Sequence, residues 1–192
     1  MSQTVLQRTP LYDIHKALGA KIVPFAGFEM PVVYKGIIEE HMAVRGAAGL
    51  FDVSHMGEVR VSGPQALAFV QNLVSNDAVK LYDGRVMYAV MCNPEGGIVD
   101  DLLVYRLGSA DFLLVINASN IEKDFHWMQA NNAMGAVLEN VSDQMALMAL
   151  QGPKALEIVS RLTSISIQTL PYYHAIRPEP GTFFGCTQAL IS

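Results

Sequence analysis

Two apolar, β-prone segments joined by a short turn sequence form the strongest pattern of hydrophobic and polar positions in the chain. Residues 86–92 and 98–105 are rich in Val, Leu and Tyr, and the Asn-Pro-Glu-Gly-Gly sequence at 93–97 combines residues that favour tight turns. The pattern predicts a β-hairpin. Asp100 and Asp101 interrupt its second strand, although burying a carboxylate without a partner costs several kcal/mol. Such a conflict between pattern and residue type marks a candidate functional site.

The alternation of side chains along this strand separates the two aspartates. Successive residues of a strand point to opposite faces, so Asp100 and Asp101 cannot enter the same pocket. Asp101 shares its face with Leu103 and Tyr105, a combination that suits a flat, polar heteroaromatic ligand, and Asp100 shares the other face with Leu102. The alternative is that one aspartate caps the turn and the other is solvated at the strand edge.

Helical spacing of apolar residues and turn residues predict the remaining elements. Thr9 is expected to cap a helix that has Pro10 at its first position and ends at Gly19. Further helices are expected over 36–45, 64–74 and 120–131, strands over 22–25, 50–53, 58–62, 111–117 and 136–139, and loops over 26–31 and 76–84.

The order of these elements predicts an α+β fold with antiparallel sheets flanked by helices. Over residues 57–140 the order β-α-β-β-β-α-β is typical of a ferredoxin-like sheet with helices on one face. The motif Gly-Pro-x-Ala-Leu-x-x-Val-x-x-Leu occurs at 63–73 and again at 152–162, each time after an apolar strand, which suggests two related lobes; a common strand-to-helix joint that arose twice is the alternative. We therefore expect a discontinuous first domain, residues 1–55 and 142–192, with a ferredoxin-like second domain, residues 56–141, inserted in it.

Composition narrows the classes of partner. The chain has 192 residues, 51% hydrophobic and 16% charged, with a net charge of −5 and no basic run, which argues against nucleic acid and anionic membrane surfaces. The two cysteines lie far apart and form no Cys-x-x-Cys motif, so a reducing compartment is expected. No apolar run reaches the roughly 18 residues of a membrane helix. No two histidines have metal-ligand spacing, so no metal is expected.

Residues 187–192 resemble an unfinished strand, which predicts that the chain is part of a longer protein.

Five residues are candidates for a site, and each has a structural alternative. His55 lies at the joint between the two predicted domains and is either functional or a hydrogen-bonded structural histidine. Met56 is a pocket wall or core filler. Tyr88 and Tyr105, on the strands of the hairpin, stack on a ligand or fill the core. Asn117, at the end of an apolar strand, is a pocket amide or a turn residue.

Two longer strings carry a resemblance to a known family. They are Phe-Asp-Val-Ser-His-Met-Gly at 51–57 and Gly-Gly-Ile-Val-Asp-Asp-Leu at 96–102; shorter matches lie at 9–12, 25–31, 40–45, 49–50, 76–77, 115–120 and 150–153. With these residues the chain resembles the amino-terminal part of the glycine cleavage system T-protein family of aminomethyltransferases. It departs from the family's usual residues at Phe28, where Trp is more frequent, and at Pro24, where Asp is common.

The resemblance implies a transfer of the methylene of the aminomethyl group on the lipoyl arm of H-protein to tetrahydrofolate, with release of ammonia. It implies that Asp101 is the catalytic carboxylate and that Met56, Tyr88, Asp101, Tyr105 and Asn117 are folate-pocket positions. It also implies a carboxy-terminal barrel beyond Ser192, and a location in the bacterial cytoplasm or the mitochondrial matrix. A folate-dependent demethylase and a non-catalytic folate-binding assembly factor share this scaffold and are the alternatives.

Overall fold

The computed structural model describes residues 5–183 and 185–192, which form two compact units. The first unit runs up to His55 and continues over Ala146–Leu162. The second unit comprises Met56–Met145 and Thr163–Ser192. We describe each unit by itself.

The grouping of residues 163–192 differs from the expected assignment to the first domain. Backbone hydrogen bonds attach this segment to the start of the hairpin in the second unit: Val86 N donates to Tyr173 O at 2.8 Å, and Ala175 N donates to Gly84 O at 2.7 Å. These bonds follow no hydrophobic periodicity, so the sequence pattern gave no indication of them.

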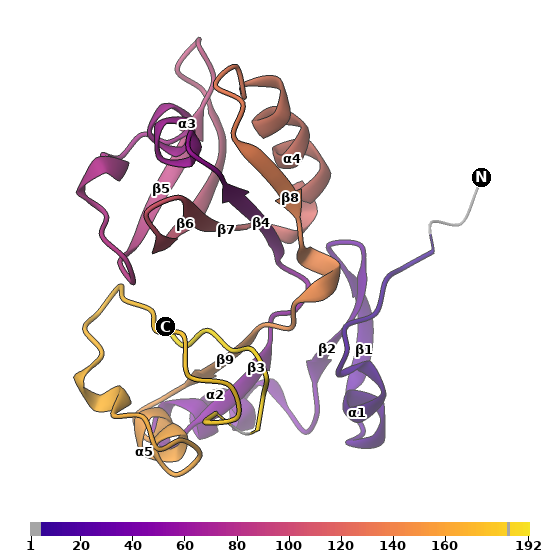
Figure 1. The fold of residues 1–192 in the computed structure, drawn as a ribbon. Helices are drawn as coiled ribbons and strands as arrows, with labels where there is room; N and C mark the ends of the chain where they lie inside the picture. The colour runs from indigo at the N-terminus through magenta and orange to yellow at the C-terminus, as the bar shows by residue number, and fades with distance from the viewer. Residues whose placement is uncertain (1–4, 184) are drawn as a thin grey trace. The chain divides into compact units, whose positions relative to one another are not determined.

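A five-stranded antiparallel sheet organises the second unit (Figure 1). In the order of the sheet its strands are β5 (Val86–Cys92), β6 (Ile98–Gly108), β7 (Asp111–Ile116), β4 (Gly57–Ser62) and β8 (Val137–Asn140). The strands β8, β4, β7 and β6 have the neighbour order of a ferredoxin-like sheet, and β5 adds an edge strand. The prediction of antiparallel sheets flanked by helices is confirmed.

Two helices, α3 (Ala66–Leu73) and α4 (Ile121–Ala130), cover one face of this sheet (Figure 1). One face of each strand supplies the core: Val59 and Val61, for example, are fully buried with Phe69 of α3 and Met128 of α4. Burying a side chain of this size contributes about 1.5–3 kcal/mol, so this packing is the main source of the unit's stability. Short 3₁₀ turns complete the unit at η1 (Ala78–Lys80), η2 (Ala118–Asn120), η3 (Ser142–Gln144) and η4 (Ile167–Thr169).

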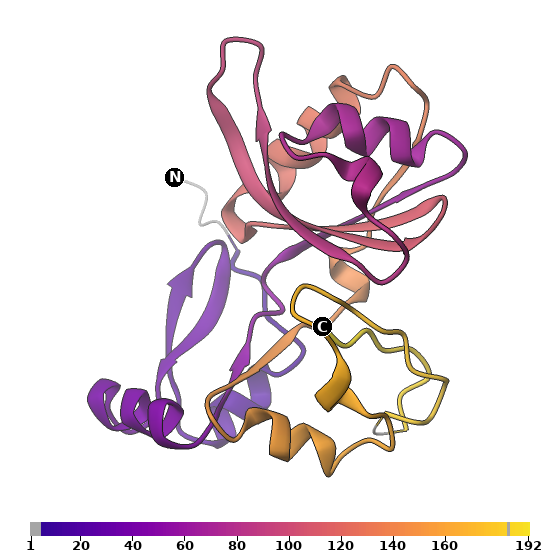
Figure 2. The same ribbon diagram turned by 90° about the vertical axis from the view of Figure 1, so that its left-hand side faces the viewer.

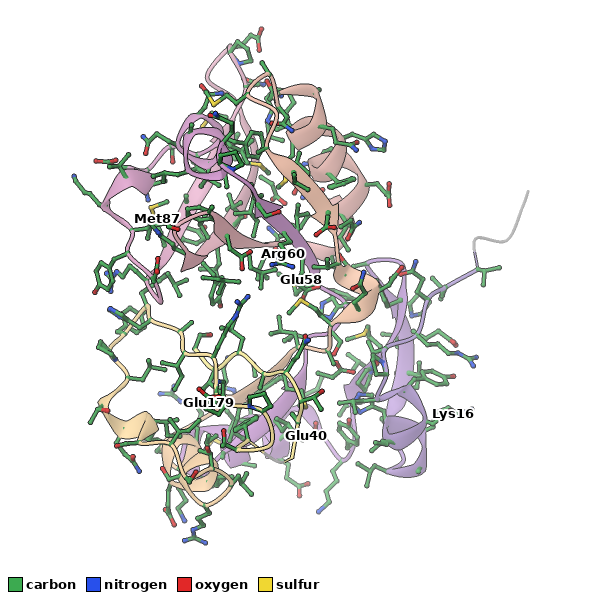
Figure 3. All side chains as sticks on the ribbon, in the orientation of Figure 1. Lys16, Glu40, Glu58, Arg60, Met87 and Glu179 are labelled. Atoms are coloured by element: carbon green, nitrogen blue, oxygen red, sulfur yellow. The ribbon has the colours of Figure 1, made fainter. Side chains whose placement is uncertain are left out.

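The other face of the sheet, which we call the open face, carries the alternate residues. Glu58 and Arg60, labelled in Figure 3, alternate on β4 with the buried valines of the helix-covered face. On β6 the same alternation places Leu102 in the core and Asp101 on the open face, which confirms that the two side chains point to opposite faces.

The β5–β6 hairpin is closed by the Asn-Pro-Glu-Gly-Gly turn and protrudes from the body of the unit (Figure 2). Asn93 caps the turn, since its Oδ1 accepts from Gly97 N at 2.7 Å and its backbone O accepts from Gly96 N at 3.0 Å. Gly96 has φ +83°, a conformation that favours glycine. The turn therefore uses an asparagine cap, and neither aspartate of β6 is needed for it.

The described residues of the first unit form two small antiparallel sheets and three helices. The sheets pair β1 (Lys21–Phe25) with β2 (Phe28–Val33) and β3 (Gly49–Asp52) with β9 (Met148–Gln151). The helices are α1 (Tyr12–Ala17), α2 (Ile37–Gly46) and α5 (Ala155–Ser160).

Two local expectations for this unit were wrong. Helix α1 begins at Tyr12, and Thr9 contributes its backbone O to Tyr12 N, not a side-chain cap. Residues 28–31 form strand β2 and not a loop, so only the turn at Ala26 and Gly27 separates β1 from β2. Pro31 misled the prediction, but a two-stranded sheet has only edge strands, in which a proline needs no partner for its missing N–H.

The repeated Gly-Pro motif forms a strand-to-helix joint in both units. Gly63 and Gly152 both have positive φ, +93° and +116°, and each precedes a helix that begins three residues later. At Gly152 a Cβ atom would lie 2.5 Å from Val44 O, so glycine is also required there for close backbone approach. Both copies of the motif therefore form the same joint, in which a glycine with positive φ leads into a helix.

Candidate active site on the open face of the second unit

The structure joins three of the predicted site residues through hydrogen bonds. Tyr88 OH donates to Asp101 Oδ2 at 3.0 Å, and Asn117 Nδ2 donates to Asp101 Oδ1 at 3.1 Å. The register of the sheet explains the first contact, because Tyr88 pairs with Leu103, two residues from Asp101 on the same face. Both oxygens of the Asp101 carboxyl group are thereby held by neighbouring strands.

Tyr88 combines a fixed hydroxyl with an accessible ring. Its hydrogen bond to Asp101, with a smaller contribution from burial, raises the pKa of the phenol above its ordinary value, so the hydroxyl stays a donor. The residue is 50% exposed, so its ring remains available for a ligand next to the carboxylate. Tyr88 is therefore not a core residue.

Asn117 lies between the two aspartates at the end of β7. Its Nδ2 also donates to Asp101 O at 3.2 Å and to Asp100 Oδ1 at 3.0 Å. Its backbone O accepts from Asn120 N at 2.9 Å, so the residue serves as a strand-end turn residue as well. The amide has two hydrogens for three acceptors, and it connects the carboxyl groups of the two faces.

Asp100 belongs to the helix-covered side and is buried. Burial favours its neutral form, but hydrogen bonds from Asp124, Asn120 and Asn117 outweigh burial and lower the pKa of Asp100 below its ordinary value. The residue is therefore a charged acceptor inside the unit, and the alternative of a turn cap or solvated edge residue does not apply to it.

The other two predicted residues lie nearby with different contacts. Tyr105, also on the open face of β6, is buried, and its OH lies 3.2 Å from Ser192 Oγ. Met56 directly precedes β4, whose first residue, Gly57, pairs with the neighbour of Asn117 in the sheet. Met56 is half-buried, which fits the wall of a pocket.

Tyr173 was not identified from the sequence. Burial and the neighbouring tyrosines, Tyr172 and Tyr105, raise the pKa of Tyr173, and the residue has φ +57°. Its backbone O accepts from Val86 N in β5, which places it at the edge of the sheet that carries Tyr88. No regular element contains Tyr173, so periodicity could not reveal it; the pair of adjacent tyrosines was the only signal.

His55, in contrast, has structural contacts. Its ring packs edge-on against Phe25, at a centroid distance of 5.5 Å, and against Phe28 at 6.3 Å. Burial lowers the pKa of His55, which favours the neutral ring. These contacts lie within the first unit and give His55 a packing role. Its buried Nδ1 has no hydrogen-bond partner among the described residues, so the expectation of a hydrogen-bonded structural histidine is not confirmed.

The described residues, 5–183 and 185–192, contain neither a metal-binding group of side chains nor a membrane-spanning helix. No three His, Cys, Asp or Glu side chains in that part of the chain are grouped so that they could hold a metal ion. No helix in the same residues is long and apolar enough to cross a membrane.

Comparison with known proteins identifies the family. Residues 11–185 match the family model described as the GCVT N-terminal domain. The chain belongs to this family. The resemblance drawn from the motifs at 51–57 and 96–102 is thereby confirmed.

Relatives in the GCVT family include curated bacterial proteins named aminomethyltransferase. The Desulforamulus reducens protein is 57% identical over 162 residues, covering 84% of this chain and 44% of that protein. The Flavobacterium psychrophilum protein is 48% identical over 187 residues, covering 97% of this chain and 51% of that protein. The chain thus spans about half the length of the curated relatives that it matches.

Two solved structures share the fold of this chain. The crystal structure of glycine cleavage system aminomethyltransferase T from Bartonella henselae superposes with a TM-score of 0.85 at 35% identity, covering 91% of this chain and 48% of that one. Heterotetrameric sarcosine oxidase from Corynebacterium sp. U-96 gives a TM-score of 0.58 at 14% identity, covering 96% and 84%, which shows a shared fold alone.

Proposed function

We propose that this chain supplies the catalytic carboxylate and part of the folate pocket of an aminomethyltransferase of the glycine cleavage system. The observation that carries the proposal is the Asp101 carboxyl group, held by Tyr88 and Asn117 on the open face of a GCVT-family domain. The relatives named aminomethyltransferase support the reaction class.

The residues around Asp101 fit a pterin ring. Tyr88 offers a half-exposed aromatic ring for stacking, and the sheet beside it is apolar at Leu103 and Val115, which pair with each other. The carboxylate of Asp101 can accept hydrogen bonds from the N–H groups of such a ring. This combination of a flat apolar surface and one anionic acceptor suits tetrahydrofolate as the acceptor substrate.

Tetrahydrofolate, when bound, supplies the amine nitrogen that takes the methylene group of the aminomethyl-lipoyl donor. Ammonia leaves, the carbon–sulfur bond to the lipoyl arm breaks, and methylenetetrahydrofolate and dihydrolipoyl H-protein result. Asp101 stabilises the positive charge that develops on the reacting amine, and it can accept that amine's proton. Tyr88 and Asn117 hold the carboxylate in one orientation, which lowers the entropy cost of reaching the reactive geometry. Tyr105 and Met56 complete the proposed pocket.

The proposed donor is the lipoylated H-protein of the glycine cleavage system, and the proposed location is the cytoplasm of a bacterium. Both proposals rest on the relatives, which are bacterial and named for this activity. Because the chain spans about half of those relatives, we assign the complete reaction to this chain together with a second half of the kind that they contain.

Calorimetric titration with tetrahydrofolate tests the pocket. The chain and a chimera that continues past Ser192 with the second half of the Desulforamulus reducens relative are each measured as wild type, as Asp101→Asn and as Asp143→Asn. Asp143 is an exposed carboxylate of the same unit and serves as the matched control. We expect micromolar affinity in the chimera, a modest loss in Asp101→Asn and none in Asp143→Asn.

A wild-type chimera that does not bind tetrahydrofolate contradicts the proposal. If it binds tetrahydrofolate but releases no ammonia with aminomethyl-lipoyl H-protein, the demethylase or assembly-factor alternative replaces the transferase.

A further inference from the structure

A buried pair of carboxyl groups lies behind Asp101, on the helix-covered side of the sheet. Asp124 of α4 is completely buried, and Asp100 of β6 is 8% exposed. Each carboxyl group shifts the pKa of the other, as two carboxyl groups do when one of them donates a proton to the other. Lys123 Nζ lies 3.4 Å from Asp124 Oδ1 but donates to Val99 O at 2.6 Å, and among the described residues no hydrogen-bond donor satisfies either Asp124 oxygen.

Two such carboxyl groups require a proton between them. A pair of ionised carboxylates in contact inside a protein repel each other, whereas one proton turns the contact into a strong hydrogen bond. Burial, and then Asp100, raise the pKa of Asp124 to about 7, while the pKa of Asp100 is lowered. The proton therefore belongs to Asp124, which donates to a charged Asp100.

This pair is connected to the proposed catalytic carboxylate through one side chain. Asp100 Oδ1 accepts from Asn117 Nδ2 at 3.0 Å, and the same nitrogen donates to Asp101 Oδ1 at 3.1 Å. The hydrogen bonds thus run from Asp124 to Asp100, then through Asn117 to Asp101. A change in the protonation of Asp124 therefore alters the hydrogen bond that the amide of Asn117 donates to Asp101 on the open face.

We propose that Asp124 is a positioning residue for Asp101, acting through Asp100 and Asn117. By donating to Asp100, it keeps that charged side chain in place to accept from Asn117, which in turn orients the Asp101 carboxylate. The proposal deepens the proposed function, on which it rests for the catalytic role of Asp101. Asp124 touches no substrate in this scheme.

The scheme makes the position of Asp101 sensitive to pH near neutrality. The charged groups that face Asp124 are Asp100, from β6, and Lys123, from α4 itself. When Asp124 loses its proton, repulsion between the two carboxylates displaces Asp100 and loosens its bond with Asn117. The Asp101 carboxyl group should then register the titration of a residue that it does not contact.

Carbon-13 NMR of the aspartate side-chain carboxyl groups tests this in the chain without any ligand. We expect the Asp100 and Asp101 signals of the wild type to show an inflection at about pH 7, and Asp124→Asn to abolish it because the amide donates without titrating. Glu58→Gln is the matched control, since burial also raises the pKa of Glu58 to about 7. In Glu58→Gln the inflection should remain.

A second variant tests whether the titration of Asp124 reaches Asp101 through the hydrogen bonds of Asn117, which we call the relay, or directly through space. Asn117→Ala should keep the inflection at Asp100 and lose it at Asp101, because the connecting amide is gone. An Asp101 signal that stays flat through neutral pH in the wild type refutes the proposal, as does an inflection that Glu58→Gln removes. If the chain shows the relay but the chimera binds no tetrahydrofolate, this inference stands and the proposed function is rejected.

Discussion

Glu58 allows a quantitative test of how burial determines stability in the second unit. Glu58 is 1% exposed on the open face, and neither carboxyl oxygen has a hydrogen-bond partner among the described residues. Burial raises its pKa from 4.5 to about 7. Replacing it by the uncharged, nearly isosteric glutamine should therefore stabilise the unit, but only at pH values at which Glu58 would ionise.

The sign and size of the expected change in the free energy of unfolding follow from the linkage between protonation and folding. A carboxyl group with a higher pKa in the folded than in the unfolded chain binds protons more tightly when folded, so stability falls as the pH rises from 4.5 to about 7. The difference between these two pKa values corresponds to a loss of about 3 kcal/mol in the free energy of unfolding above pH 7. Relative to the wild type, Glu58→Gln should be about equally stable near pH 4 and up to about 3 kcal/mol more stable at about pH 8.

Trp127, the only tryptophan, provides the assay. It lies in α4 and packs against the core of the second unit, so its fluorescence reports the unfolding of that unit. Urea unfolding near pH 4 and pH 8 gives the free energy of each variant, with Asp143→Asn as the exposed-carboxylate control. A Glu58→Gln variant that is less stable than the wild type at the higher pH, or whose advantage does not change with pH, refutes the reasoning.

Two further substitutions test other parts of the structure. Tyr88→Phe removes one donor to Asp101 at a half-exposed site, so we expect steady-state kinetics of the chimera to show about a threefold to tenfold loss of kcat, and an unchanged kcat would contradict a role for the hydroxyl. Gly152→Ala places a Cβ atom 2.5 Å from Val44 O at φ +116° and should destabilise the first unit by about 2 kcal/mol in calorimetric unfolding. Gly46→Ala, in α2 with open space around it, is the control and should be neutral or stabilising.

The sequence predicted the second unit well because its strands are apolar, β-prone segments separated by turn residues. These segments and turns identified the hairpin and the order of elements over 57–140, and side-chain alternation along one strand separated the faces of Asp100 and Asp101. The site residues were predicted from the resemblance of the motifs to a known family. The register of the adjacent strands then showed why Tyr88 and Asn117 reach Asp101.

Other features depend on contacts that no local pattern encodes. The segment from Thr163 joins the second unit through backbone hydrogen bonds and isolated bridges. Asp124 has the place of an ordinary polar helix residue in the sequence, and only the packing of α4 against β6 reveals its pairing with Asp100. The burial of Glu58 was likewise not evident, because a glutamate that alternates with valines is expected to be solvated.

The most direct test of the account is single-turnover release of ammonia from aminomethyl-lipoyl H-protein by the chimera, as wild type and as Asp101→Asn, with tetrahydrofolate saturating. We predict that Asp101→Asn binds tetrahydrofolate but releases ammonia about 10²-fold more slowly or worse, as expected for loss of one electrostatic or acid–base group. If Asp101→Asn releases ammonia at the wild-type rate, Asp101 has no chemical role and the central claim is wrong.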